Sequence, residues 1–272
     1  MASPEVTILI PNYRTPQITT LCLRLLRKHT DGDRIHVIVI DNNSRDASVE
    51  YLRTLRWIQL IERVPATNES GPLSHARALD EGLSRVMTPY VLALHTDTLI
   101  RRPGWLDVLL QPLEANLDIA GVGSWKLDQN TTIIKRFGKN LKMGLSGMFR
   151  HSGRNLFGCE EPSNSDRYLR SHCAVYRTDL LIRHNLHFSE RGDVMPAGKM
   201  IHRALTAQGY HMAFLSPDIL SRYLCHLEHA TMVLNPELGA SKRTVSRGLA
   251  RITRLLNELN EDTILNDVTL DE

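Results

Sequence analysis

Short apolar runs alternate with amphipathic helical patterns over the first 94 residues of the chain. A strand that is covered on both faces is apolar at consecutive positions. Four such runs occupy residues 6–10, 35–40, 58–61 and 90–94. Between them, apolar residues at helical spacing predict helices at 16–29, 49–55 and 73–86, the second capped by Asp46. Strand–helix–strand units place their strands in parallel, so the pattern predicts an α/β fold with a mostly parallel central sheet covered by helices.

The rest of the chain is less regular. A proline–glycine pair at 103–104 opens a short predicted helix. Further strands are expected at 119–125, 171–176 and 223–226, and further helices at 198–208 and 240–260. The last helix precedes an acidic tail at 261–272. These elements predict a second half that completes the sheet, followed by a C-terminal helical extension.

The composition is that of an ordinary globular protein. With 42% hydrophobic and 23% charged residues, it excludes disordered, collagen-like and coiled-coil chains. Four cysteines without a C-x-x-C pair argue against a disulfide scaffold or a four-thiolate zinc site, and they are typical of a reducing compartment. Because no apolar run is long enough for a signal peptide or a transmembrane segment, we expect a cytoplasmic protein.

Polar residues follow the predicted strands at the end where ligands bind in parallel sheets. Asp41 follows the second strand, and its carboxylate is suited to a ribose hydroxyl or a base N–H. A turn or capping role explains it equally well. Tyr13 follows the first strand and offers a face for stacking a base, although it also fits a core or rim aromatic. The first two strand ends are therefore candidates for a nucleotide site.

Asp97 follows the fourth strand in the sequence HTDT at 95–98. A carboxylate there suits Mg²⁺ or Mn²⁺, which proteins usually bind through one or two carboxylates together with substrate phosphates. His226, at the end of another expected strand, is the candidate second ligand, and His229 is its rival. A single histidine is more often a packed or surface residue, so this pairing depends on the context of the whole chain.

The order of these segments resembles the inverting family 2 glycosyltransferases of the GT-A fold. The sequence VIVIDNNSRDAS at 37–48 is similar to that family's VVDNxSxDxS segment, and YVLALHTDT at 90–98 is similar to its YVLFLDSDT segment. Three weaker matches keep the same order: PNYR at 11–14, NESG followed by ARALDEG at 68–82, and HLEHAT at 226–231. The resemblance is strong over 5–110, patchy over 170–231 and absent from the C-terminal helix.

The resemblance implies a nucleotide-diphosphate-sugar donor carrying UDP, dTDP or GDP, and an Mn²⁺ or Mg²⁺ ion. The ion would be bound by Asp97 and His226. The residues that it assigns to the nucleotide sugar are Pro11, Tyr13, Asp41, Asn43, Asn68, Arg77, His95 and Thr96. It also implies a GT-A domain at 1–232, with a donor half at 1–110 and an acceptor half at 111–232, and a separate segment at 233–272 that holds the C-terminal helix and acidic tail.

Two departures from the family pattern bear on the chemistry. His95 stands where the family has the first Asp of D-x-D, and a neutral imidazole adds no negative charge to the metal site. Residues 196–197 are Pro-Ala where the family has the Glu-Asp that supplies its catalytic base. The nearest carboxylates are Asp193, our first candidate for the base, and Glu190. If neither is the base, the chain is a degenerate protein that binds nucleotide sugar without transferring it.

The net charge is only +3, but basic residues are concentrated in two segments of the second half of the chain, where we expect the acceptor to bind. Residues 129–159 contain no Asp or Glu, and arginines on the last helix recur every three or four positions. The candidate anion-binding residues are Lys135, Arg136, Lys139, Lys142, Arg247 and Arg251. A solvated helix face is the ordinary explanation of such a stripe. The acceptor that we favour is a cell-surface or lipid-linked glycan, reached by peripheral contact at the inner face of the membrane. An anionic polymer or DNA with a modified base is the alternative.

Overall fold

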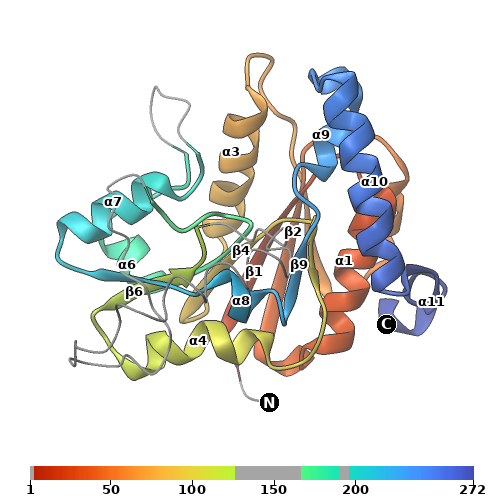
Figure 1. Ribbon diagram of the computed structural model, residues 1–272. Coiled ribbons are helices and arrows are strands. Elements are labelled where there is room, and N and C mark those ends of the chain that lie inside the picture. The colour runs from red at the N-terminus through yellow and green to blue at the C-terminus, as the bar shows by residue number, and fades with distance from the viewer. Residues whose placement is uncertain (1–2, 126–166, 190–195) are drawn as a thin grey trace, which may run out of the picture.

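The computed structural model describes residues 3–125, 167–189 and 196–272 of the chain (Figure 1). Six of the residues singled out above lie outside these ranges. They are the candidate bases Glu190 and Asp193 and the basic residues Lys135, Arg136, Lys139 and Lys142. Within the described ranges, no helix has both the length and the apolar character needed to cross a bilayer.

A seven-stranded sheet forms the centre of the molecule. Its strands are β1 (Val6–Asn12), β2 (Ile35–Asp41), β3 (Ile58–Glu62), β4 (Tyr90–Leu94), β6 (Ile119–Gly123), β7 (Cys173–Arg177) and β8 (His211–Phe214). They are ordered β3-β2-β1-β4-β7-β6-β8, and β7 runs antiparallel to both of its neighbours while the other neighbours are parallel. This arrangement confirms the predicted α/β fold with a mostly parallel sheet.

Helices cover both faces of the sheet. The helices are α1 (Pro16–His29), α2 (Ala47–Thr54), α3 (Gly71–Leu83), α4 (Trp105–Ala115), α6 (Thr178–Arg183), α7 (Lys199–Ala207), α8 (Pro217–Leu220), α9 (Ala230–Leu234), α10 (Lys242–Glu258) and α11 (Glu261–Leu265). Alternate residues of each strand point to opposite sides, so Ile8 and Ile10 pack with α1 while Leu9 packs with α3. Because both faces are buried, every residue of β1 is inaccessible to solvent, which explains the continuous apolar runs.

A second, two-stranded sheet lies beside the carboxyl end of β4. It pairs β5 (Thr98–Ile100) with β9 (Leu224–His226) in antiparallel register, with Thr98 opposite His226. The sequence pattern predicted a strand near β9 but not β5 or β8, since strands of three or four residues show too little periodicity. This pairing determines which distant residues meet at the end of β4.

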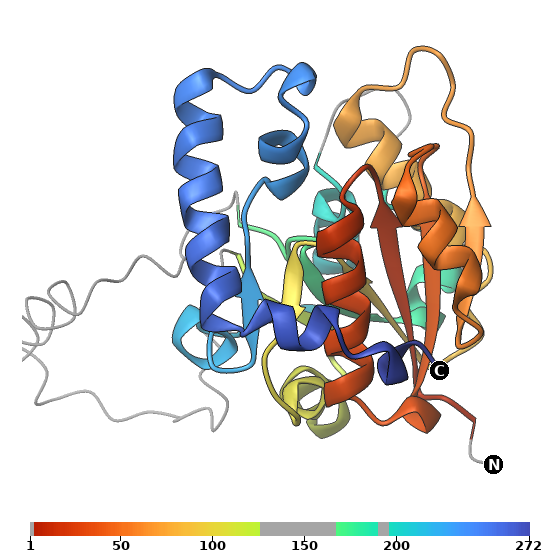
Figure 2. The ribbon, with the colours of Figure 1, turned by 90° about the vertical axis from the view of Figure 1, so that its right-hand side faces the viewer.

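The C-terminal segment packs against α1 as an ordered part of the same core. Ile252, Leu255 and Ile264 belong to the hydrophobic cluster that also contains Ile8. In Figure 2, α10 lies beside α9, α11 crosses α1, and the chain ends beside α1. The expected acidic tail thus forms α11 and a 3₁₀ turn, Val268–Asp271, which lies on α1.

A partly buried ion pair fixes this last turn to the rest of the molecule. The Arg24 guanidinium on α1 lies 2.5 Å from Asp271 and also donates to the carbonyl oxygens of Ile264 and Leu265. Tyr51 donates a further hydrogen bond of 2.8 Å to Asp271. Burial by itself disfavours the charged carboxylate, but the hydrogen bonds from Arg24 and Tyr51 lower the pKa of Asp271 below its ordinary value of 3.8. We therefore expect the pair to contribute to stability.

Replacement of Asp271 by Ala is expected to destabilise the fold by about 2–3 kcal/mol, because it leaves a buried guanidinium without its carboxylate. Chemical denaturation at neutral pH measures this change, and Glu258→Ala, an exposed carboxylate on α10, is the matched control. Since the folded-state pKa of Asp271 is lowered, the contribution is present above pH 4 and declines as the pH falls through that lowered value. Equal unfolding free energies for the two variants at neutral pH would contradict the assignment.

Candidate functional site

The strand order of the central sheet reverses between β1 and β4. The chain passes from β1 to β2 and β3 on one side of β1, and then returns to place β4 on the other side. In open α/β sheets, ligands bind at the carboxyl ends of the strands where the order reverses. Tyr13 follows β1 and His95 follows β4, so the predicted nucleotide and metal residues lie at this position.

The ends of β1 and β2 are joined by a buried polar network. The Asn12 side chain donates to the carboxylate of Asp41 at 2.8 Å and to the hydroxyl of Ser48 at 2.9 Å. The Asp41 carboxylate also accepts from the backbone N–H of Ser44, at 3.0 Å, and from its hydroxyl, at 2.5 Å. Asp41 thus holds the turn after β2 by accepting from three protein donors, and one of the four acceptor positions of its carboxylate has no protein donor within the described residues.

The other nucleotide candidates are distributed around this network. Pro11 and Thr96 are buried, Tyr13 and Asn43 are half-buried, and Asn68 is exposed in the loop before α3. The Tyr13 ring is covered by the guanidinium of Arg14, 5.3 Å from its centre. Their contacts with a nucleotide stay predictions.

Arg77 lies on the exposed side of α3 and is already engaged with Glu69, at 2.8 Å. Burial alone would raise the pKa of Glu69, yet hydrogen bonds from Arg63 and Arg77 lower it to about 2. The pair fixes the loop that carries Asn68 onto α3. A diphosphate would have to compete with Glu69 for Arg77, and the predicted contact of Arg77 with a nucleotide is untested.

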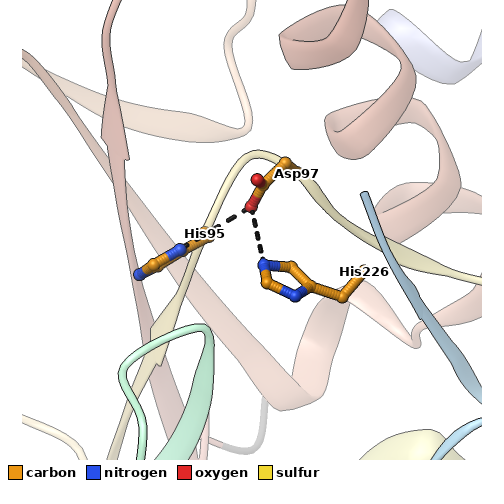
Figure 3. Close-up of side chains that lie close together, drawn as sticks. All are labelled: His95, Asp97 and His226. Carbon is orange, nitrogen blue, oxygen red and sulfur yellow. Dashed lines mark ion pairs between the residues drawn. The ribbon is translucent and has the colours of Figure 1, made fainter. Parts of the chain in front are cut away.

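Three potential metal ligands converge between β4, β5 and β9. Nε2 of His226 lies 3.2 Å from Oδ1 of Asp97, and Nδ1 of His95 lies 3.6 Å from the same oxygen. The three ligand atoms all lie within 4.8 Å of one another (Figure 3). The antiparallel pairing of β5 with β9 brings His226 to Asp97. The backbone N–H of Leu227 donates to the backbone carbonyl oxygen of Asp97 at 2.8 Å, and that of Ala230 donates to Oδ2 of its carboxylate at 3.2 Å. Of the two rival histidines, His226 faces Asp97.

The chemistry of this group fits a divalent cation. Oδ1 of Asp97 is buried and accepts no hydrogen bond within the described residues, although two imidazole nitrogens approach it. Burial alone would raise the pKa of Asp97, but the imidazoles of His226 and His95 hold it well below its ordinary value. An ionised, buried oxygen beside two imidazole nitrogens is an incomplete polar cluster, and a cation completes it.

Two further histidines surround these ligands. Ser171 Oγ lies 3.1 Å from Nε2 of His95 and 3.3 Å from Nε2 of His75. The His172 ring stacks on His226 with centres 4.9 Å apart. Burial and the proximity of His95 lower the pKa of His75 to about 3, and burial and the proximity of His226 lower that of His172 well below the ordinary value, so both rings are neutral. Sequence reasoning missed them, because neither belongs to a matched motif.

The arginines on α10 divide into two kinds. Arg251 donates to the carboxylate of Glu228 and to the carbonyl oxygens of Leu227 and Glu228, and it also lines the pocket described below, so its predicted contact with an anion stays a prediction. It holds the turn between β9 and α9. Arg247 is exposed and lines a pocket of about 250 Å³ beside α9 and α10. The pocket is also lined by Arg243, Thr244 and His229.

Comparison with known proteins identifies one family. The model of the family described as glycosyl transferase family 2 matches residues 7–184. No curated protein sequence matches the chain. Among solved structures, the chain is similar to a mannosyltransferase from Pyrobaculum calidifontis, solved with GDP-mannose and Mn²⁺, with 17% identity, 97% of this chain and 70% of that chain covered, and a TM-score of 0.57. It is also similar to residues 1–349 of TarS from S. aureus, with 18% identity, 96% and 69% covered, and a TM-score of 0.51.

Proposed function

This chain belongs to glycosyl transferase family 2 and is a transferase, and from that premise we propose that it moves a sugar from a nucleotide-diphosphate sugar to an acceptor hydroxyl with inversion at the anomeric carbon. The observation that carries the proposal is the convergence of His95, Asp97 and His226 at the reversal of strand order. The similar mannosyltransferase was solved with a nucleotide sugar and a metal ion. We propose a UDP-, dTDP- or GDP-sugar as the donor.

The chain's residues would hold the donor across the carboxyl ends of β1, β2 and β4. Tyr13 offers a ring for the base, and the remaining acceptor position of Asp41 suits a base N–H or a ribose hydroxyl. Asp97, His95 and His226 would bind Mn²⁺ or Mg²⁺ beside the diphosphate. Such an ion, when bound, acts as a Lewis acid that stabilises the negative charge developing on the departing diphosphate.

Asp97→Asn is expected to lower the rate of sugar transfer at least about a hundredfold, because the amide removes the only negative charge among the three ligands. Release of nucleoside diphosphate from UDP-glucose, dTDP-glucose and GDP-mannose measures turnover, with Mn²⁺, Mg²⁺ or a chelator present. Asp118→Asn, an exposed carboxylate before β6, is the control and should behave as wild type. Equal turnover with and without chelator would refute the metal assignment. Tight nucleotide binding without transfer from any donor would instead favour the degenerate binding protein.

An acceptor hydroxyl needs a base on the side of the sugar opposite the departing diphosphate. We propose Asp193 as this base and Glu190 as the second candidate. Both lie outside the described residues, but the chain just before them is fixed. The half-buried carboxylate of Asp80 on α3 accepts hydrogen bonds from the backbone N–H of Phe188, at 2.6 Å, and from that of Ser189, at 3.0 Å. This anchor ties the approach to Glu190 to the same helix that carries His75.

Asp193→Asn is expected to lower kcat by roughly a hundredfold or more, with the KM for the nucleotide sugar unchanged, because loss of a general base slows the chemical step without touching donor binding. Glu190→Gln is the matched variant and is expected to leave kcat close to that of wild type. Steady-state kinetics on the best donor separate kcat from KM. The opposite ranking of the two variants would assign the base to Glu190, and normal kcat in both would rule out this segment.

For the acceptor we propose a glycan or lipid-linked glycan that carries an anionic group, in the cytoplasm and with peripheral membrane contact. The pocket beside α9 and α10 supports the proposal that the acceptor carries an anionic group. Arg243 and Arg247 line it, and neither has an ion-pair partner within the described part of the chain. Two uncompensated guanidinium groups and the hydroxyl of Thr244 suit a phosphate. A phosphodiester of DNA has the same chemistry, and it is the alternative that the test must separate.

The double variant Arg243→Gln, Arg247→Gln is expected to weaken binding of inorganic phosphate at least about tenfold, because each charge-assisted hydrogen bond contributes about 1.5–3 kcal/mol. Calorimetry at low and high salt measures the change, with anionic lipid vesicles and a DNA duplex as separate arms. Arg254→Gln, on the same helix but outside the pocket, is the control. Equal phosphate affinity in the double variant and wild type would exclude the pocket. DNA bound more tightly than vesicles, with a loss in the double variant, would favour the nucleic-acid acceptor.

A further inference from the structure

Aromatic and cationic side chains gather where β6 ends and the chain enters β7, beside the candidate metal site. Trp125 follows β6, whose carboxyl end lies at the same edge of the sheet as that of β4, because β7 runs antiparallel to both strands. The backbone N–H of Arg170 donates to the carbonyl oxygen of Ser124 at 3.1 Å. The Ser124 hydroxyl lies 3.0 Å from Nε2 of His172, and the His172 ring stacks on that of His226. These side chains therefore adjoin the candidate metal site.

The Arg170 guanidinium lies over two aromatic rings. Its central carbon is 4.8 Å from the centre of the Trp125 ring and 5.7 Å from that of Tyr168. The two rings meet edge to face, with centres 5.3 Å apart. Tyr168 is buried and Trp125 is half-buried, whereas Arg170 is exposed. The rings thus support an exposed guanidinium, and we call Trp125, Tyr168 and Arg170 the Arg170 platform.

The backbone of the Arg170 platform is closely packed. Leu169 is fully buried, and a Cβ atom added at Gly121 on β6 would lie 3.0 Å from its side chain and 2.7 Å from the Tyr176 ring. The carbonyl oxygen of Leu169 would lie 3.1 Å from a Cβ atom at Gly198, the residue before α7. The platform is therefore packed between β6 and the start of α7.

The charges of the platform favour an anion. Within the described residues, the Arg170 side chain has neither a hydrogen bond nor an ion pair. A second cation, Nζ of Lys199, lies 5.9 Å from the centre of the Tyr168 ring. A guanidinium that lies on a ring face keeps the N–H donors of its edge for another partner, and their spacing matches two oxygens of a carboxylate or a phosphate. A negatively charged substituent is thus the partner that Arg170 suits.

We propose that the Arg170 platform binds an anionic substituent, a carboxylate or a phosphate, on the sugar ring of the acceptor, and that Arg170 determines a preference for acidic sugars. The proposal rests on the proposed function for the reaction itself. The platform lies between the candidate metal site, where the departing diphosphate would lie, and α7, which follows the segment that carries the proposed base. An acceptor hydroxyl would approach the donor sugar on that side. The platform shares no residue with the pocket beside α9 and α10.

Binding of simple sugars tests the proposal without turnover. Wild type is titrated with glucuronate, glucose 6-phosphate and glucose by calorimetry and by tryptophan fluorescence, with a chelator present so that no metal ion contributes. We expect the acidic sugars to bind at least about tenfold more tightly than glucose, because glucose lacks the group that pairs with Arg170. A preference for only one of the two acids would identify the substituent. Equal affinity for all three sugars would overturn the proposal.

Arg170→Gln is expected to abolish the preference for glucuronate and to leave the affinity for glucose unchanged. Arg102→Gln is the matched control, because Arg102 is also exposed and lies 4.5 Å from the centre of an aromatic ring, that of Tyr223. Trp125→Phe keeps a ring under the guanidinium, so it should retain the preference and lose most of the fluorescence change. A preference for glucuronate that persists in Arg170→Gln would overturn the proposal.

Two further arms separate the platform from other anion sites. Glucose 6-phosphate is also titrated into the double variant Arg243→Gln, Arg247→Gln, which should keep the preference that depends on Arg170. Loss of the preference there, with retention in Arg170→Gln, would assign the anion to the pocket and overturn the proposal. UDP-glucuronate and UDP-glucose are titrated in the same way. A dependence on Arg170 that is confined to these nucleotide sugars would overturn the assignment to the acceptor.

The outcomes for this proposal and for the proposed function are separable. A preference for acidic sugars that depends on Arg170, without transfer from any donor, would refute the proposed function alone. Sugar transfer to acidic and neutral acceptors with equal efficiency would refute this inference alone.

Discussion

The pairing of β5 with β9 is the constraint on which the site depends. β4 ends at Leu94, and a turn of three residues leads into β5, so Asp97 lies at the point where the main sheet gives way to the small one. The register that sets Thr98 opposite His226 delivers a histidine from the far end of the chain to this carboxylate. Backbone N–H groups of Leu227 and Ala230 then bond Asp97 directly. Without the three-residue pairing of β5 with β9, the candidate ligands Asp97 and His226 would lie in separate parts of the fold.

The turn that follows β9 has an unfavourable backbone conformation. Glu228 and His229 both adopt left-handed backbone conformations, which are unfavourable for residues other than glycine. The turn they form lets His226 and the N–H of Ala230 face Asp97 while Glu228 and His229 line the α9–α10 pocket. Arg251 compensates by binding the carboxylate and two carbonyl oxygens of the turn. One strained turn therefore separates the candidate metal ligands from the basic pocket, and Arg251 on the final long helix stabilises this turn.

The sequence predicts most of the fold because burial on both faces leaves an unambiguous pattern. The bounds of α1 and β4 agree with the expected 16–29 and 90–94, and Asp46 caps α2 as expected. The three-residue strand β5 has no such pattern. The contact between His75 on α3 and Ser171 before β7 joins two residues that are far apart in the sequence, and no sequence spacing predicts it. Helical spacing revealed the arginine stripe, but it did not show that Glu228 faces Arg251. Local periodicity thus predicts elements, whereas side-chain pairing across elements requires the register.

His95 stands where the family pattern has an Asp, and this difference would change the net charge around a bound ion. Two carboxylates would neutralise a divalent ion, whereas Asp97 together with two histidine ligands would leave a bound ion with one net positive charge. Asp97 is buried, whereas His95 and His226 are half-buried beside His75 and His172, so water screens a charge on the Asp97 side only in part. In the proposed reaction a diphosphate gains negative charge as its bond to the sugar breaks, so this extra positive charge would favour the transition state over the intact donor. Nitrogen ligands at this position would therefore change the electrostatics of leaving-group departure in the proposed reaction.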